Sequence, residues 1–548
     1  MHRWAQRLTP ALIDAARLCR HSRRARDATT LGPVNADVGR GIVTRDLLVA
    51  IGLGVVSGLL MAASLRPLGW WPLAFVGLVP MIVAQYRLVR FRWCWVPVTT
   101  AVFVFAYVST GFLYTAHALW FAIGAPVIWA LIVGGFALVD RSLNERTRWR
   151  WFIILMPVMW VALDAVRVYL VLTGTDGYIA YSLYRFPVLI APVSTVGIIG
   201  LNLFILMVNY TVALAVLRFR AQSNPRMRTV LASAVVMLAV IGGWIGLGVG
   251  TVNATTASSG PTVRVAAIQP GSTLMTSSLG GQQSAEEAKQ MQAILVRMTT
   301  EAAARGAQLV VWPEEIIGFN PATAPASQTQ WLRDLVSSTG VYLVTGYIQT
   351  PADGSYTNAA ALLDPSGQVL GHYTKAHEAP FDDDLFQTGD TYSSYPTDLA
   401  TIGMMICFDE EFPDTSRFIA LSGANIIAMP AWQFKELASI QEFDKLALRA
   451  AEDRVPIVSA DLAWDSAIVD ANGAIIVNTD DLTAYGRAAV LVADVALGPR
   501  NAPFLLLGNW VGMLCVGATV VLVALAAGTH LRGRRDVTPT HAPPHARQ

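Results

Sequence analysis

The sequence predicts a polytopic α-helical membrane protein of about eight transmembrane helices, into which one extracytoplasmic α/β sandwich domain is inserted. Two observations carry this prediction. The chain of 548 residues is 54% hydrophobic and only 14% charged, which is too apolar for a soluble protein and too long for a single domain. Apolar runs of about 20 residues, the length that crosses a bilayer, flank one stretch in which the hydrophobic period changes to that of strands.

Eight apolar runs are the candidate transmembrane helices. Arginine-rich loops, such as those with Arg90, Arg146 and Arg226, alternate with loops that are poor in arginine. The positive-inside rule places the arginine-rich loops in the cytoplasm, so we expect both chain ends to be cytoplasmic and the α/β domain to be extracytoplasmic. The runs are Leu47 to Leu65, Trp71 to Ala84, Val96 to Tyr114, Leu119 to Val139, Trp151 to Leu172, Val188 to Leu217, Val230 to Val249 and Phe504 to Ala527.

The composition changes divide the chain into six segments. The clearest boundary lies near Asn253, where Thr, Ala, Ser and Gly replace the apolar residues and mark a short linker. In order, the segments are an arginine-rich and disordered cytoplasmic extension (1–46), seven transmembrane helices (47–252), the linker (253–261), the α/β domain (262–499), a C-terminal transmembrane helix (504–528) and a cytoplasmic tail (529–548).

Helices and hairpins are expected between the strands of the α/β domain. Ser284 and Glu287 form a capping box for a helix that Gly306 can end, and residues 442–452 read as a second helix. The turns that end in Gly367 and Gly473 are typical of hairpins. Strands are predicted at Thr262 to Ile268, Gln308 to Trp312, Tyr342 to Tyr347, Ala359 to Leu363, Ile402 to Cys407, Asn425 to Met429, Ile457 to Ala460, Ala467 to Val469 and Val490 to Val495. Strands interleaved with helices describe a layered α/β sandwich.

Charge and cysteine content exclude several classes of site. The net charge of +2 comes without a basic face interleaved with aromatic residues, so we expect no nucleic acid partner. The four cysteines, Cys19, Cys94, Cys407 and Cys515, lie far apart in the sequence, which argues against a disulfide framework or a CxxC metal site. No cluster of His, Cys and Asp has metal-ligand spacing, and we therefore predict neither a metal nor a cofactor. Cys407 is the only cysteine of the α/β domain.

Three side chains on segments that read as strand ends can form a nucleophilic site. Cys407 ends an apolar strand at an acidic turn, Glu314 follows Trp312-Pro313, and Lys375 ends the run Tyr373-Thr-Lys. A thiol that attacks an acyl carbon needs a base and a donor for the developing oxyanion, and Glu and Lys suit those two tasks. The backbone N–H of Phe408 is a possible second donor. Each residue alone also has an ordinary explanation, as a buried small hydrophobe, a strand end or a solvated charge.

The α/β domain resembles the nitrilase, or carbon-nitrogen hydrolase, superfamily, and the chain as a whole resembles the apolipoprotein N-acyltransferase family. The motifs that carry this resemblance are Trp312-Pro-Glu314, Lys375-Ala-His-Glu-Ala-Pro-Phe381, Ile406-Cys-Phe-Asp409, Trp160-Val-Ala-Leu-Asp164-Ala-Val-Arg167, Gly177-Tyr178, Tyr181-Ser182 and Gly508-Asn-Trp510. It implies a multi-pass protein of the bacterial inner or plasma membrane that carries an extracytoplasmic, nitrilase-like αββα sandwich. It also implies Glu314 as base, Lys375 as oxyanion support and Cys407 as nucleophile.

The resemblance also implies further site residues. Asp383 stands where the family has a second glutamate, and Phe408-Asp409 replaces the family's Tyr-Glu. His377 is expected beside the reacting groups. The candidate contacts of the substrate cleft are Trp432 and Phe434, in a loop that can act as a lid, together with Asp164, Arg167, Tyr178 and Tyr181 of the membrane part. Asp164 and Arg167 lie three residues apart on one helix face, where a structural ion pair is the alternative to a substrate contact.

The expected activity is the transfer of an acyl chain from a phospholipid, through a thioester on Cys407, to the N-terminal amine of a diacylglyceryl-cysteine lipoprotein. The loops Pro430-Ala-Trp-Gln-Phe-Lys435 and Val458-Ser-Ala-Asp-Leu-Ala463 depart from the family pattern, and they shape the cleft. An alternative is therefore a membrane-anchored amidase of the nitrilase type, which would use the same three side chains on another amide. A non-catalytic scaffold that has kept the fold is the third hypothesis.

Overall fold

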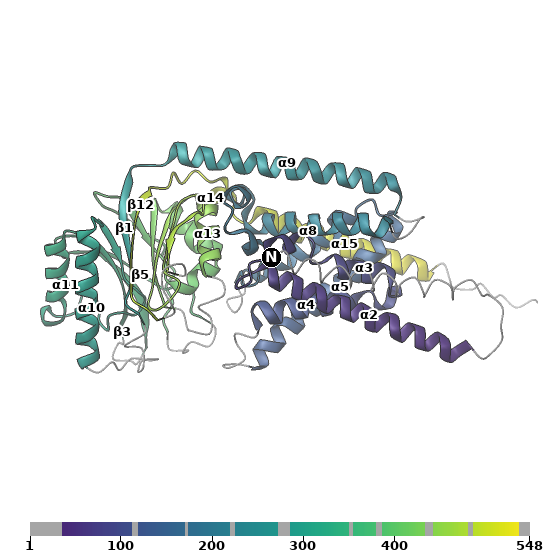
Figure 1. Cartoon of the computed structure of the whole chain (residues 1–548), viewed down its shortest axis with the longest axis horizontal. Coiled ribbons are helices and arrows are strands. Elements are labelled where there is room, and N and C mark those ends of the chain that lie inside the picture. The colour runs from purple at the N-terminus through teal and green to yellow at the C-terminus, as the bar shows by residue number, and fades with distance from the viewer. Residues whose placement is uncertain are drawn as a thin grey trace, which may run out of the picture.

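Two structural parts make up the protein, a bundle of apolar helices and an α/β sandwich (Figure 1). The computed structural model describes residues 35–111, 119–169, 174–219, 225–271, 285–349, 355–379, 386–432, 442–479 and 486–535. The arginine-rich extension up to residue 34, Ser284 of the expected capping box and the end of the tail lie outside these residues.

The helical bundle is built from both ends of the described chain. Within the described residues, six helices are long and apolar enough to cross a membrane, in segments 44–64, 91–109, 119–146, 193–218, 227–258 and 510–528. The protein is therefore a membrane protein. The helices of the bundle are α2 (Asn35–Ser64), α3 (Val79–Arg87), α4 (Trp95–Ser109), α5 (Leu119–Arg146), α6 (Phe152–Arg167), α7 (Pro187–Ile190), α8 (Val193–Phe219), α9 (Met227–Ser258), α14 (Pro503–Leu507) and α15 (Trp510–Arg535), with 3-10 helices η1 (Trp71–Phe75), η2 (Phe91–Trp93) and η4 (Ile179–Leu183).

The predicted count of eight spans is not confirmed. The run from Trp71 to Ala84 is not one helix, because the structure divides it into η1 and α3, each of which begins with a proline at its first or second position. The nine residues of α3 reach only about 13 Å, well short of the hydrocarbon core. The sixteen residues of α6 are also shorter than the six candidate spans. Proline lacks the N–H for a helical hydrogen bond and crowds the preceding turn, and Pro80 lies directly after the break between η1 and α3.

Two helices of the bundle extend beyond the segments predicted for it. Helix α2 begins at Asn35, inside the segment expected to be a disordered extension. Helix α9 continues to Ser258, through most of the linker predicted at 253–261. Threonine and alanine are compatible with a helix that neighbouring residues have already nucleated, so the change in composition near Asn253 does not end it. Figure 1 shows α9 running along one side of the molecule from the bundle to the sandwich.

The sandwich contains two six-stranded sheets. The first has the order β12-β1-β2-β3-β4-β5 and the second the order β11-β10-β9-β8-β7-β6. The central strand pairs β1–β2, β2–β3, β7–β8 and β8–β9 are parallel, and the outer pairs are antiparallel. The strands are β1 (Thr262–Gln269), β2 (Leu309–Val311), β3 (Tyr342–Gln349), β4 (Thr357–Leu363), β5 (Val369–Thr374), β6 (Ser394–Pro396), β7 (Thr401–Met404), β8 (Ile426–Ala431), β9 (Ile457–Asp461), β10 (Ala467–Val469), β11 (Ile475–Asn478) and β12 (Ala489–Ala496).

All nine predicted strands are present, within a few residues of the expected ends. Strands β5, β6 and β11 were not predicted, and each of them lies at the edge of a sheet and is partly exposed. The hairpin glycines Gly367 and Gly473 have φ of 81° and 77°, as their turns require. The chain bends away from β7 before Cys407, which begins the 3-10 helix η6 (Cys407–Glu411).

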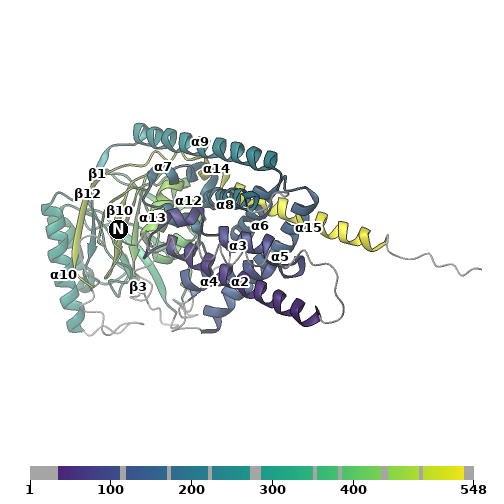
Figure 2. The same cartoon turned by 45° about the vertical axis from the view of Figure 1, so that its right-hand side comes forward.

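Helices cover both outer faces of the sandwich. Helices α10 (Ala285–Ala304) and α11 (Ala326–Thr339) pack on the first sheet through a core that includes Leu295, Leu332 and Val310. Helices α12 (Pro413–Leu421) and α13 (Glu442–Asp453) lie on the other side, between the second sheet and the bundle (Figures 1 and 2). Because α13 contacts α8 and η4 as well as β10, it is the main helix at the junction of the two parts.

Candidate active site

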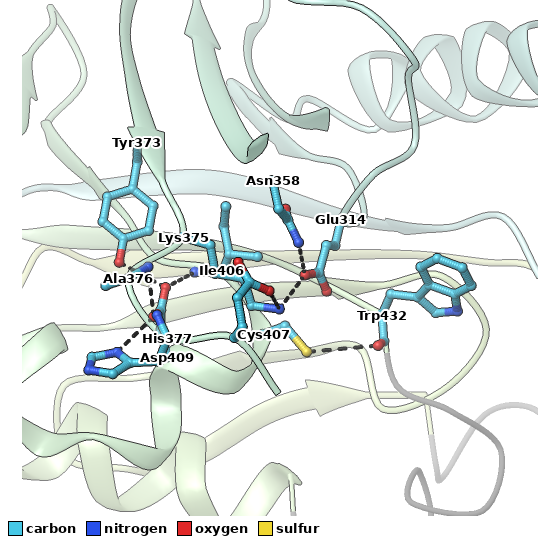
Figure 3. A network of polar contacts seen from close by, with 11 residues as sticks. Glu314, Asn358, Tyr373, Lys375, Ala376, His377, Ile406, Cys407, Asp409 and Trp432 are labelled. Carbon is cyan, nitrogen blue, oxygen red and sulfur yellow. Dashed lines mark hydrogen bonds and ion pairs between the residues drawn. The ribbon is translucent and has the colours of Figure 1, made fainter. Parts of the chain in front are cut away.

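The three predicted reactive side chains come from strand ends of two different sheets. Glu314 follows β2 and Lys375 follows β5 of the first sheet, whereas Cys407 follows β7 of the second sheet. Figure 3 shows their side chains pointing toward one another between the sheets. The structure therefore brings together Glu314, Lys375 and Cys407, as the sequence predicted from their positions at strand ends.

A buried ion pair forms one side of the site. Lys375 Nζ lies 2.9 Å from Glu314 Oε1, and the two side chains are only 4% and 5% exposed. Asn358, on the neighbouring strand β4, donates from Nδ2 to the same oxygen at 2.7 Å. A second carboxylate, Glu378, lies 3.6 Å from Lys375 Nζ. Removing either member of a buried pair leaves an uncompensated charge, so both side chains are held in place by each other.

A close backbone approach positions Glu314. The N–H of Gly346, on β3, donates to the carbonyl of Pro313 at 3.1 Å. A Cβ at Gly346 would lie 2.4 Å from that carbonyl oxygen and 2.5 Å from the Cα of Glu314. Glycine is therefore required at this position because any side chain would push Glu314 out of the site.

Cys407 occupies a strained backbone position. Its φ is 44°, in the left-handed region that non-glycine residues rarely adopt, and it lies at the turn from β7 into η6. The side chain is 7% exposed, and Sγ lies 3.8 Å from the carbonyl oxygen of Trp432. The preceding carbonyl, that of Ala431, accepts from the N–H of Glu314 at 3.3 Å, so β8 places Trp432 beside both groups. Strain of this kind persists only where the surrounding structure fixes the residue.

Asp409 joins the segment that carries Lys375 to the segment that carries Cys407. Its Oδ2 accepts from the hydroxyl of Tyr373 at 2.8 Å and from the N–H of Ile406 at 3.0 Å. Its Oδ1 accepts from the N–H groups of Ala376 at 3.2 Å and His377 at 2.9 Å. The carboxylate is fully buried, and every one of these partners lies within two residues of Lys375 or one residue of Cys407. Asp409 thus holds two strand ends from different sheets in register.

The other predicted supporting residues lie around this carboxylate. The ring of His377 stacks on Phe412 with centroids 3.8 Å apart, and its Nδ1 lies 3.1 Å from Asp409. Phe408 packs edge-on against Phe412. Asp383 and Phe434 lie outside the described residues, so their predicted roles stay predictions.

Three of the four candidate contacts from the membrane part, Asp164, Arg167 and Tyr178, lie together in a cluster apart from Cys407. The guanidinium of Arg167 lies 4.7 Å from the ring centroid of Trp129 and 4.8 Å from that of Tyr178. Tyr178 donates to the backbone carbonyl of Asp164 at 2.5 Å. The Asp164 carboxylate accepts from Asn202 through Oδ2, while its Oδ1 and the Nε and Nη2 of Arg167 make no hydrogen bond among the described side chains. A role of this cluster in substrate binding stays a prediction.

Tyr181 takes part in a different contact. Its hydroxyl lies 2.6 Å from Oγ1 of Thr175, which in turn donates to the carboxylate of Glu411 at 3.0 Å. Glu411 is the last residue of η6, the helix that Cys407 begins. Tyr181 therefore supports the junction between the bundle and the sandwich.

Sequence reasoning missed several residues of the site. Asn358 is a lone amide within the otherwise apolar β4, and a polar residue in a buried strand is the signal that could have identified it. Tyr373 was part of a quoted motif but was assigned no role. Lys445, on α13, forms ion pairs with Glu411 and Asp176, which are remote in sequence, so no local pattern indicates that contact.

Comparisons with known proteins agree with this fold. Residues 264–499 match the family model for carbon-nitrogen hydrolases, and residues 57–211 match that for the apolipoprotein N-acyltransferase N-terminal domain. An apolipoprotein N-acyltransferase from Geobacter metallireducens is 27% identical over 518 residues, which cover 88% of this chain and 96% of that protein. A nitrilase from Pyrococcus abyssi is 33% identical over 178 residues, 30% of this chain and 66% of that protein.

Solved structures are similar to the sandwich. An amidase from Nesterenkonia is 20% identical, with a TM-score of 0.36, and the match covers 45% of this chain and 96% of that chain. The match over residues 264–499 makes the sandwich a carbon-nitrogen hydrolase domain. Because a second family model covers the bundle and one relative aligns with nearly the whole chain, the protein belongs to the apolipoprotein N-acyltransferase family.

We predict that Asp409→Asn lowers the rate of any reaction at Cys407 by about 100-fold. The NH₂ group of the asparagine would replace one carboxylate oxygen and would face the two N–H or O–H donors that this oxygen accepts from. Each buried donor that loses its acceptor costs about 1–3 kcal/mol. The measurement is kcat with a thermal unfolding curve of the same sample. Asp494→Asn, which affects an exposed ion pair with Arg264, is the matched control. An unchanged kcat would contradict the positioning role of Asp409.

A second prediction concerns Glu410, a buried residue that follows Asp409. Burial raises the pKa of the Glu410 carboxyl from 4.5 to about 8, although Lys445 and Arg449 oppose the rise, while Asp176 and Asp461 add to it. Because the folded state retains this proton and the unfolded state loses it, the stabilisation is complete below pH 4.5 and is lost as the pH rises through about 8.

Glu410→Gln should therefore unfold at a higher temperature than the unmodified protein above pH 8, and the difference should shrink as the pH falls toward 4.5. Thermal unfolding in detergent over this pH range measures it. Glu301→Gln, at an exposed side chain of α10, is the control. A difference that does not change with pH would refute the assignment of the buried proton.

Proposed function

We propose that this protein is a membrane N-acyltransferase that matures lipoproteins. It takes an acyl chain from a phospholipid as a thioester on Cys407 and passes it to the N-terminal amine of a diacylglyceryl-cysteine lipoprotein. The observation that supports this most directly is the meeting of Cys407 with the buried Glu314–Lys375 pair in a chain that aligns with 96% of an apolipoprotein N-acyltransferase.

In the first half-reaction, the sulfur of Cys407 attacks the carbonyl carbon of the phospholipid ester. Glu314 accepts the thiol proton, and Lys375 stabilises the oxyanion of the tetrahedral intermediate, a contribution of about 10²–10³ in rate for one well-placed donor. The C–O bond then breaks, and the proton passes from Glu314 to the departing lysophospholipid oxygen. The product is a thioester on Cys407.

In the second half-reaction, the amine of the acceptor attacks the thioester carbon. Glu314 accepts a proton from the amine nitrogen, the C–S bond breaks, and the proton returns to the thiolate of Cys407. Water must be kept from the thioester, and the low exposure of Glu314, Lys375 and Cys407 supports this requirement.

The position of the site supports lipid substrates. Cys407 and Glu411 are the two ends of η6, which spans about 8 Å, and Glu411 contacts the bundle through Thr175. The reacting sulfur therefore lies close to the helices that cross the membrane. We propose that the bundle lies in the cytoplasmic membrane of a bacterium and that the sandwich is extracytoplasmic, as the arginine distribution indicates.

Incubating the purified protein with a phospholipid labelled in its acyl chain tests the activity. We expect one labelled chain per protein, released by hydroxylamine because it is a thioester, and no labelling of Cys407→Ala. Cys94→Ala and Cys515→Ala remove buried cysteines of the bundle and are the matched controls. Turnover of small amides without labelling would contradict the proposal and favour an amidase.

The orientation has its own test in intact cells. Ser355, close to β4, is replaced by Cys and exposed to a membrane-impermeant thiol reagent. We expect labelling of Ser355→Cys before lysis and of the native Cys19, in the arginine-rich extension, only after lysis. The reverse order would show that the sandwich is cytoplasmic.

A further inference from the structure

An ionic link joins the bundle to the segment that carries Cys407. Lys445 Nζ, on α13, lies 3.1 Å from the carboxylate of Asp176 and forms a second ion pair with the carboxylate of Glu411. Asp176 belongs to a loop of the bundle, Lys445 to the sandwich helix at the junction, and Glu411 to the end of η6. We name these three residues the junction clamp.

The junction clamp lies out of water. The side chains of Lys445, Asp176 and Glu411 are 11%, 12% and 1% exposed. A buried carboxylate without a cation is strongly unfavourable, so Glu411 depends on Lys445, and Lys445 is held between carboxylates from both parts of the protein. The link therefore resists any separation of α13, η6 and the bundle loop.

Backbone contacts tighten the same junction. The N–H of Thr175 donates to the carbonyl of Glu411 at 3.2 Å, and its hydroxyl donates to the same oxygen at 2.9 Å. Gly174 has φ of 43°, and a Cβ there would lie 2.7 Å from the Cβ of Glu411. Only glycine permits this approach, so the bundle loop and the end of η6 fit together along both side chain and backbone.

The junction clamp can affect the reaction because it holds the other end of the helix that begins with the strained Cys407. Cys407 adopts a positive φ at the start of η6, and Glu411 ends the same five-residue helix. Asp409 fixes the middle of η6 from the sandwich side. The junction clamp fixes its far end from the bundle side, so that η6 is held at two points and cannot relax by rotating.

We propose that Lys445 is a positioning residue for the nucleophile. Through Glu411 and Asp176 it makes the correct placement of Cys407 depend on the docking of the bundle, so that the sulfur is aligned for attack only when the membrane part is in place. The inference rests on the proposed function of Cys407, although part of its test does not.

Other charges face the clamp and belong in its test. Lys445, Arg449 and Asp176 all lie close enough to the Glu410 carboxyl to shift its pKa, so Glu410 shares the charges of the clamp. Arg449 is engaged by Glu452 at 2.5 Å, so it does not replace Lys445 as the partner of Glu411. The clamp is therefore removed by changing Lys445 alone.

The experiment uses the full-length protein in detergent with phospholipid and compares Lys445→Met with Lys445→Arg. We expect Lys445→Met to lower kcat by about 10- to 100-fold with little change in KM, because a misplaced nucleophile affects the chemical step. Lys445→Arg should restore most of the rate because it keeps the charge. Arg264→Met, which removes an exposed ion pair of the same domain, is the matched control and should leave kcat unchanged.

A second readout does not depend on acyl transfer. The rate at which iodoacetamide alkylates Cys407, followed by peptide mass spectrometry, reports the placement of the sulfur directly. This rate should change in Lys445→Met and return in Lys445→Arg. If the alkylation rates follow this pattern but the unmodified protein transfers no acyl chain, the junction clamp stands and the proposed function fails.

A milder variant keeps the inference testable if Lys445→Met does not fold. Asp176→Asn leaves the Lys445–Glu411 pair intact but loosens its hold on the bundle, and we expect a smaller loss of kcat, about 3- to 10-fold. The double variant Lys445→Met/Glu411→Gln removes both charges of the pair and replaces Lys445→Met if that single variant does not fold. The proposal is overturned if Asp176→Asn and the folded Lys445 variant both keep the kcat and the alkylation rate of the unmodified protein.

Discussion

The site depends on a single buried carboxylate, that of Asp409. Its two oxygens accept hydrogen bonds from both sides of the sandwich, from Ala376 and His377 after β5 and from Ile406 before η6. The ion pair of Glu314 and Lys375 belongs to one sheet and Cys407 to the other, so neither sheet alone can form the site. A charged acceptor that gathers several buried donors is worth more than the neutral hydrogen bonds it replaces, because no water competes there.

The same logic of buried charge extends from the site to the junction with the membrane. Glu411 follows Asp409 by two residues in η6, and its charge is balanced by Lys445 from α13. Asp176 of the bundle forms an ion pair with the same lysine, and the N–H of Thr175 donates to the backbone carbonyl of Glu411. A hydrolase-type sandwich is thereby coupled to a lipid-embedded part, which is the physical requirement for a reaction in which both substrates are held by the bilayer.

The sequence predicts much of the site and less of what supports it. Glu314, Lys375 and Cys407 were found because apolar strands end abruptly at polar residues, and Asp409 because a motif resemblance marked it. Pro72 and Pro80 indicate that the run from Trp71 to Ala84 is broken, but the hydrophobic composition of the run favoured one continuous helix in the prediction. The junction clamp was not predictable, because Asp176, Glu411 and Lys445 have no common period or motif and meet only through the packing of α13 on η4 and η6.

The most direct test of the account is a count of lysophospholipid released before any acceptor is added. A two-step transfer through Cys407 predicts a burst of one lysophospholipid per protein molecule, followed by discharge of the acyl chain when a peptide with a free diacylglyceryl-cysteine amine is supplied. Release that requires the acceptor from the start, or continuous release without it, would contradict a stable acyl-enzyme on Cys407.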